Sequence, residues 1–240
     1  MSFEYEFLSQ LSDSIGVSLT DEQIQQFACY YQRMIEKNKV MNLTGITECK
    51  EVIMKHFIDS LMLVKAVDLN SVSSIADMGT GAGFPGIPLK IAFPHLKVCL
   101  MDSLSKRLKF LDEVIDELKL QNITTLHGRA EDIGKNMLHR EQYDLCVSRA
   151  VANLSTLTEY CLPLVKEQGF FISYKSGDVN AELDSAKNAV SILGGSIEDT
   201  IFFNLPDTDM SRSFVKIKKI KKTPKKYPRK AGLPSKEPIH

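Results

Sequence analysis

The stretch Asp77-Met78-Gly79-Thr80-Gly81-Ala82-Gly83-Phe84-Pro85-Gly86 decides the fold of this chain. It ends a short apolar run at residues 73–77 and leads into a segment with helical periodicity, so it predicts a glycine-rich turn between a buried strand and a helix. Glycine permits positive φ angles and a close approach that a Cβ atom would block. Pro85 and Pro88 suit the first turn of the following helix, where amide hydrogens are not needed. We therefore expect this turn to hold a ligand through its backbone.

Short apolar runs alternate with helical stretches from residue 71 onward, which predicts an α/β fold: a mostly parallel, Rossmann-like sheet with helices on both faces. Two last runs, at residues 197–204 and 213–220, flank a turn-rich segment and predict a terminal hairpin that completes a seven-stranded sheet. The first five strands are expected at residues 73–77, 96–101, 123–127, 143–147 and 170–174. The helices between them are expected at residues 83–93, 104–120, 154–166 and 179–193.

Residues 1–70 predict a small helical N-terminal region. Apolar residues recur at three- and four-residue spacing after Thr20-Asp21-Glu22-Gln23, which fits a helix that starts with a capping box. A second helical pattern covers residues 49–67, and a polar turn at residues 41–45 separates the two. The expected domains are therefore this region, a ligand-binding domain at residues 71–218 and a basic C-terminal tail at residues 219–240.

Composition restricts the class of protein. The 240 residues are 43% hydrophobic, which is enough for one continuous core with an appendage. No apolar run approaches the roughly 20 residues that cross a bilayer, and Glu4 and Glu6 stand where a signal peptide would be positively charged. The five cysteines form no CxxC pair, so neither a disulfide framework nor a zinc site is indicated. We expect a cytoplasmic protein that binds neither membrane nor metal.

Charge is distributed unevenly along the chain although its formal net charge is zero. Residues 212–240 hold eleven Lys and Arg but one acid, Glu237, so the preceding residues carry an equal excess of acids. Such a split favours one dedicated contact with a polyanion. The alternative is a frayed terminus that only aids solubility.

The charge beside the glycine turn bears on the ligand. Gly81 to Gly86 satisfies G-x-G-x-x-G, which also occurs in nicotinamide-dependent dehydrogenases. A pyrophosphate would avoid a carboxylate such as Asp77, whereas S-adenosylmethionine brings an ammonium and a sulfonium, so Asp77 favours the cationic ligand. Its alternative role is to cap the amides of the loop. Asp102, at the end of the second strand, is expected to accept hydrogen bonds from ribose hydroxyls of either adenosyl ligand.

The ends of the third and fourth strands should meet the glycine turn, because carboxyl ends of strands line the ligand crevice of an open α/β sheet. Glu131 is expected to accept a hydrogen bond from the adenine amino group, and Ala130 to leave space for the ring. Arg149 is expected to bind the methionyl carboxylate or an RNA phosphate. A structural salt bridge between Glu131 and Arg149 is the alternative.

Several blocks together extend these expectations over nearly the whole chain. They are Asn42-Leu43-Thr44, His56 to Leu61, Asp77 to Leu89, Asp102-Ser103 with Lys106-Arg107, Arg129-Ala130-Glu131, Ser148-Arg149-Ala150 and Pro228 to Gly232. In this combination the chain resembles the RsmG family, also called glucose-inhibited division protein B. The resemblance implies a class I methyltransferase that uses S-adenosylmethionine to methylate guanine N7 in small-subunit ribosomal RNA. It also implies that Gly79, Phe84, Ala130, Glu131 and Arg149 contact the cofactor, beside Gly81 and Asp102.

Absent motifs narrow the target. The segment after the fourth strand lacks the Asn/Asp-Pro-Pro-aromatic turn common in enzymes that methylate exocyclic amines. A pyrimidine C5 methyltransferase needs a cysteine nucleophile, but Cys146 falls in an expected strand and Cys161 in an expected helix. Guanine N7 offers a lone pair and loses no proton, so no general base is required. No catalytic residue is therefore assigned.

Three N-terminal residues and the tail are candidates for RNA contacts. Asn42, His56 and Asp59 are candidates for gripping a flipped guanine, against alternative roles as a turn-forming Asn, a packed His and a helix-surface Asp. Basic residues near the C-terminus are expected to neutralise RNA phosphates: Lys216, Lys218, Lys219, Lys221, Lys222, Lys225, Lys226, Arg229 and Lys230. Two other functions stay open, a nicotinamide-dependent oxidoreductase and a non-catalytic ribosome-assembly factor on the same fold.

Overall fold

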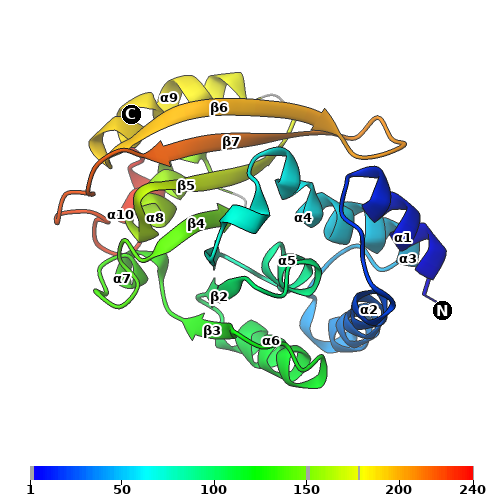
Figure 1. The fold of residues 1–240 in the computed structure, drawn as a ribbon. Helices are drawn as coiled ribbons and strands as arrows, with labels where there is room; N and C mark the ends of the chain where they lie inside the picture. Colours follow the sequence, from blue (N-terminus) through cyan, green and yellow to red (C-terminus); the bar gives the residue numbers. More distant parts are fainter. Residues whose placement is uncertain (1–2, 150–151, 178, 240) are drawn as a thin grey trace.

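A seven-stranded sheet with the strand order β3-β2-β1-β4-β5-β7-β6 forms the centre of the chain (Figure 1). The computed structural model describes residues 3–149, 152–177 and 179–239. Ala150, from the block Ser148-Arg149-Ala150, therefore lies outside the described residues. Neighbours among β1–β5 run parallel, and β7 runs antiparallel to β5 and β6, which confirms the expected fold class. The strands are β1 (Ser74–Met78), β2 (Lys97–Asp102), β3 (Ile123–His127), β4 (Tyr143–Ser148), β5 (Val165–Ser176), β6 (Gly195–Asn204) and β7 (Ser211–Lys219).

Helices cover both faces of the sheet because successive strand residues point to opposite sides. In β1, Ile75 packs into a core with the N-terminal helices, α5 and α6, whereas Ala76 packs into a second core with α8 and α9. Within the described ranges, no helix is long and apolar enough to cross a membrane. The α-helices are α1 (Tyr5–Ser14), α2 (Asp21–Met41), α3 (Cys49–Val52), α4 (Asp59–Leu61), α5 (Gly86–Ala92), α6 (Ser105–Glu117), α7 (Ala130–Ile133), α8 (Leu154–Cys161), α9 (Asn180–Ile192) and α10 (Leu233–Lys236).

The N-terminal helices are joined to the glycine turn. Thr20 and Gln23 form the expected capping box at the start of α2. Further along α2, the Tyr30 hydroxyl donates a 2.6 Å hydrogen bond to the Ala82 carbonyl in the turn. The expected second helix is α3, a π-helical segment η1 (Ile53–Ile58), α4 and the 3-10 segment η2 (Met62–Lys65) in succession. Because these helices share one hydrophobic core with the sheet, they hold the turn in place.

Two expected helix boundaries are wrong. The helix after the glycine turn begins at Gly86 rather than at residue 83. The helix expected at residues 154–166 ends at Cys161, passes into the 3-10 turn η4 (Leu162–Leu164), and is followed by β5 from Val165. Pro163 explains the second difference, since its ring fixes φ and it has no amide hydrogen to continue the helix.

The chain after β7 is packed against the body rather than frayed, and in Figure 1 it passes beside α7 and α8. Beyond β7, the Tyr227 carbonyl accepts a hydrogen bond from Arg140 Nη1 at 2.9 Å, and the Pro234 carbonyl accepts one from the Thr156 hydroxyl at 2.9 Å. At the end of β7, Lys219 is fully buried, and its Nζ donates to the Leu162 carbonyl at 2.8 Å. The expectation that Lys219 binds RNA phosphate is therefore wrong. The expected domain boundaries after residues 70 and 218 stay predictions. A short 3-10 turn, η3 (Leu69–Ser71), spans the first of these boundaries and precedes β1.

Candidate functional site

The Asp77 carboxylate organises the glycine turn from beneath. Its Oδ2 accepts hydrogen bonds from the Thr80 hydroxyl at 2.6 Å and from the Gly86 amide at 2.9 Å. A Cβ on residue 86 would lie 2.3 Å from Leu100 Cδ2 and 2.7 Å from Asp77 Oδ2, so only glycine fits there. Asp77 thus has the loop-capping role that was the alternative to ligand binding.

One carboxylate oxygen of Asp77 is buried without a hydrogen-bond donor among the described residues. The residue is completely buried, and its Oδ1 has no hydrogen-bond partner among the described residues. Burial raises the pKa of Asp77 to about 6, although the bonds from Thr80 and Gly86 act in the opposite direction. The ionised carboxylate is therefore costly in the folded state.

Replacing Asp77 by Asn should remove a pH-dependent loss of stability. Because the folded pKa of about 6 exceeds the unfolded value of 3.8, the carboxyl contributes no penalty below about pH 4 and its full penalty above about pH 6. As the pH rises through this window, the unfolding free energy of the wild type should therefore fall by about 3 kcal/mol relative to that of Asp77→Asn. Urea unfolding of both proteins from pH 4 to 7 measures it, and a constant difference contradicts the assignment.

A cavity of about 600 Å³ lies above the turn, within the range of about 300–1,000 Å³ typical of small-molecule sites. The ends of β1, β2 and β4 meet there, as the sheet topology requires. Six of the seven expected cofactor residues line it: Gly79, Gly81, Phe84, Asp102, Ala130 and Arg149.

Asp102 connects the cavity wall to the turn. Its Oδ2 accepts a hydrogen bond from the Gly81 amide at 3.0 Å, and its Oδ1 accepts one from the Leu104 amide at 2.8 Å. Arg107 is more distant, at 3.5 Å from Oδ2. A carboxylate accepts up to about four hydrogen bonds, so Asp102 retains capacity for a donor in the cavity.

Glu131 is the exception among the expected cofactor residues. It is buried and does not line the cavity, and its Oε1 accepts a 2.7 Å hydrogen bond from the Gly232 amide in the C-terminal segment. The suggested salt bridge between Glu131 and Arg149 is wrong, because Arg149 pairs with Asp59 instead. Contact between Glu131 and adenine stays a prediction.

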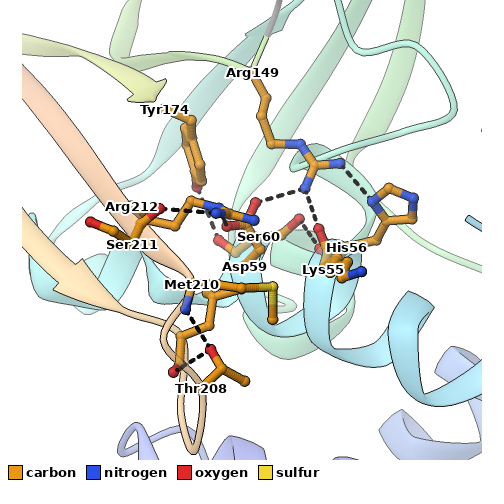
Figure 2. A network of polar contacts seen from close by, with 11 residues as sticks. Lys55, His56, Asp59, Ser60, Arg149, Tyr174, Thr208, Met210, Ser211 and Arg212 are labelled. Carbon is orange, nitrogen blue, oxygen red and sulfur yellow. Dashed lines mark hydrogen bonds and ion pairs between the residues drawn. The ribbon is translucent and has the colours of Figure 1, made fainter. Parts of the chain in front are cut away.

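Arg149 lies between His56 and Asp59, as Figure 2 shows. Its Nη1 donates to Asp59 Oδ2 at 2.9 Å and to the Lys55 carbonyl at 3.2 Å, while Nη2 donates to His56 Nδ1 at 3.2 Å. On the other side of Asp59, Arg212 Nε donates to Oδ1 at 2.9 Å. One buried carboxylate therefore orients two guanidinium groups.

His56 is a neutral, packed side chain. Burial lowers the pKa of His56 to about 3, and the neighbouring Arg149 charge acts in the same direction. Since Nδ1 accepts from Arg149, the Nε2 hydrogen is directed at Thr44 Oγ1, 2.8 Å away. The ring also stacks on Phe84, with centroids 4.6 Å apart. The ring is packed as the alternative predicted, but it also lines the cavity, so a contact between His56 and the target base stays a prediction.

The other candidates for gripping the base differ from one another. Asn42 ends α2 with a φ of 49°, so its turn-forming role is confirmed. Asp59 is only 5% exposed, so the helix-surface alternative is wrong.

The two cysteines considered as nucleophiles are buried in regular secondary structure. Cys146 lies in β4 and Cys161 in α8, as expected, and burial raises the pKa of Cys146. Among the described residues no group of three or more His, Cys, Asp or Glu could hold a metal ion.

The sequence patterns missed Arg212 and Gly232 as parts of this region. Arg212 entered only the charge count, and its pairing with Asp59 joins residues 153 positions apart. The block at residues 228–232 did single out the segment that reaches Glu131, but nothing in it named the partner.

Comparison with known proteins identifies the family. The model of the GidB family, described as rRNA small subunit methyltransferase G, matches residues 23–215. The chain belongs to this family. The protein named Ribosomal RNA small subunit methyltransferase G of Lachnoclostridium phytofermentans is 54% identical over 94% of this chain and 93% of its own length. Its namesake in Bacillus subtilis is 49% identical over 98% of both chains.

Family members are thus methyltransferases of small-subunit ribosomal RNA by name, which favours an enzyme over the alternatives. Solved structures support the fold. The crystal structure of M. jannaschii TYW2 in complex with AdoMet superposes with a TM-score of 0.50 at 15% identity, covering 62% of this chain and 70% of that one. The Rossmann-like class I methyltransferase fold predicted for this family member is confirmed.

Proposed function

We propose that this chain transfers the methyl group of S-adenosylmethionine to N7 of a guanine in small-subunit ribosomal RNA, in the bacterial cytoplasm. Family membership supports the reaction class. The single structural observation that carries the proposal is the cavity where the glycine turn, Asp102 and the end of β4 meet. The choice of guanine as the target base and of N7 as the methylated atom rests on the family resemblance and on the absent motifs.

The cavity suits the cofactor. Gly81, with a φ of 62°, turns its amide toward Asp102 and leaves the space beside its Cα open, so a ligand can approach the backbone. Asp102 would hold the ribose, and Ala130 leaves space for the adenine ring. The donors of Arg149 that have no partner among the described residues would bind the methionyl carboxylate. Glu131, the residue after Ala130, would accept a hydrogen bond from the adenine amino group.

The chain need only position and dehydrate the reactants. When bound, S-adenosylmethionine supplies a methyl group activated by its sulfonium. Guanine N7 carries a free lone pair and loses no proton, so no residue has to act as a base. Holding the reactants in line contributes up to about 7–11 kcal/mol through orientation. The rigid glycine turn and the fixed Arg149 serve that purpose.

Two measurements on the full chain should decide this function. Calorimetric titration with S-adenosylmethionine should release heat and titration with NADH should not. Radiolabelled methyl should then pass to small-subunit RNA or to the assembled particle, and mapping should place it on a guanine N7. Binding without transfer to either substrate would support an assembly factor, and heat with NADH alone would support an oxidoreductase.

Five of the basic residues expected to bind RNA are exposed and are the proposed contacts: Lys221, Lys222, Lys225, Lys226 and Lys230. Lys216 is paired with Glu198 at 3.0 Å and Arg229 with Glu159 at 2.7 Å, and RNA contacts of these two residues and of Lys218 stay predictions. Each neutralised phosphate steepens the fall of affinity with salt. RNA binding should therefore weaken strongly as the salt concentration rises.

A further inference from the structure

A second, larger cavity of about 910 Å³ lies next to the proposed cofactor site. His56, Arg149 and Ala152 line both cavities, so they form a shared wall. The larger cavity extends from this wall to the hairpin strands β6 and β7. A group bound there would be adjacent to whatever occupies the first cavity.

The hairpin brings an aromatic ring and a cation to this cavity. Phe203 on β6 and Arg212 on β7 stand directly opposite in the antiparallel register, so both side chains project from the same face of the sheet. Phe203 is partly exposed, and its ring is supported by Phe214 with centroids 4.7 Å apart. Flipped bases in RNA are typically stacked on aromatic rings, and arginine is suited to phosphate.

Arg212 is held in place but still has donors to offer. Its Nε is bound to Asp59, and its Nη1 donates to the Ser211 carbonyl at 2.9 Å. The described part of the chain provides no partner for Nη2. Lys55 is paired with Glu51, and Lys175 with Glu182 at 2.6 Å. Arg149 and Arg212 share the single carboxylate of Asp59, so one positive charge is left there. This charge favours an anion beside the two guanidinium groups.

We infer that the larger cavity receives the target guanine nucleotide flipped out of the RNA, with its base on Phe203 and its phosphate at Arg212. The inference rests on the proposed function and adds the place of the substrate. Enzymes that modify a base inside structured RNA must take it out of the stack into such a pocket. Asp59 has a positioning role, because it fixes Arg212 toward the nucleotide and Arg149 in the shared wall.

Replacing Phe203 by Leu tests the stacking surface, since Leu fills the space without a planar ring. Methyl transfer to RNA should lose about 5- to 150-fold in kcat/KM, the range of one lost base-aromatic stack. Phe203→Tyr should retain activity, and S-adenosylmethionine affinity by calorimetry should be unchanged in both. The matched control is Phe202→Leu on the opposite face of the same strand, where the side chain is 56% exposed. Equal activity of Phe203→Leu and Phe202→Leu would overturn the inference.

Replacing Arg212 by Gln tests the phosphate contact independently. The slope of log affinity for RNA against log salt should decrease by about 0.7–0.9, the effect of one lost phosphate contact. Melting temperatures of the variants confirm that each is folded. If Arg212→Gln keeps the wild-type slope, the phosphate assignment is wrong. Wild-type protein that binds no S-adenosylmethionine would instead refute the proposed function, so the two failures are distinct.

Discussion

Replacing Arg229 by Ala should lower the free energy of unfolding by about 3–5 kcal/mol, the usual cost of leaving a buried charge unpaired. Its partner Glu159, in α8, is only 1% exposed. Arg229 Nη2 donates to Glu159 Oε2 at 2.7 Å and Nε donates to Oε1 at 3.0 Å, while the Arg229 amide adds a bond of 2.7 Å. Without the guanidinium, the Arg229 amide would be the one hydrogen-bond donor left to the carboxylate among the residues that the structure describes.

Denaturant unfolding measures this loss, and the melting temperature should fall by roughly 6–20 °C for a chain of this size. Lys225→Ala is the matched control, because Lys225 is an exposed cation in the same segment and its loss should change stability by less than about 0.5 kcal/mol. Adding Glu159→Gln to Arg229→Ala should recover part of the stability. Equal unfolding free energies for Arg229→Ala and Lys225→Ala would show that the segment is not anchored by this pair.

Because the C-terminal segment is anchored to the body, deleting it would not test its RNA contacts alone. Removing residues 219–240 would take away the exposed lysines together with the partners of Glu159 and Glu131. Weaker methylation by such a protein would therefore combine lost RNA contacts with lost structure beside the cofactor cavity. Alanine substitutions at the exposed lysines alone separate the two effects.

Local chemistry made much of the fold predictable. Short apolar runs located the strands, and the Thr20 capping box marked the start of α2 correctly. Seven cofactor residues were predicted to meet, and six of them line one cavity, because parallel strands end at the same edge of a sheet. Pro163 also marks the end of α8 in the sequence, although the apolar periodicity continues past it to residue 166.

Contacts between distant segments could not be predicted in the same way. Asp59 pairs with residues 90 and 153 positions away, and Glu131 with one 101 positions away. A helical carboxylate has the same local pattern whether it faces solvent or a buried arginine, so Asp59 resembled a surface residue. Only the packed fold determines which cation reaches it.

Placing an aspartate at Gly81 should lower the affinity for S-adenosylmethionine by about a hundredfold or more, equivalent to about 3 kcal/mol. The space beside the Gly81 Cα is open, with only the Gly79 carbonyl at 4.0 Å, so the new side chain would occupy the cavity. Its carboxylate would also lie near that of Asp102, which is buried, and like charges there disfavour each other. Methyl transfer should be lost in parallel.

Backbone strain must be separated from this effect, because residue 81 has a φ of 62° that side chains rarely adopt. Gly16→Asp is the matched control, since Gly16 has a φ of 77° and a Cβ at that residue would have nothing within 4 Å. Both variants carry similar strain, so they should melt at similar temperatures, yet only Gly81→Asp should lose heat of binding in calorimetry. If both bind the cofactor as tightly as wild type, the cofactor lies elsewhere on the chain, and the glycine turn has only a structural role.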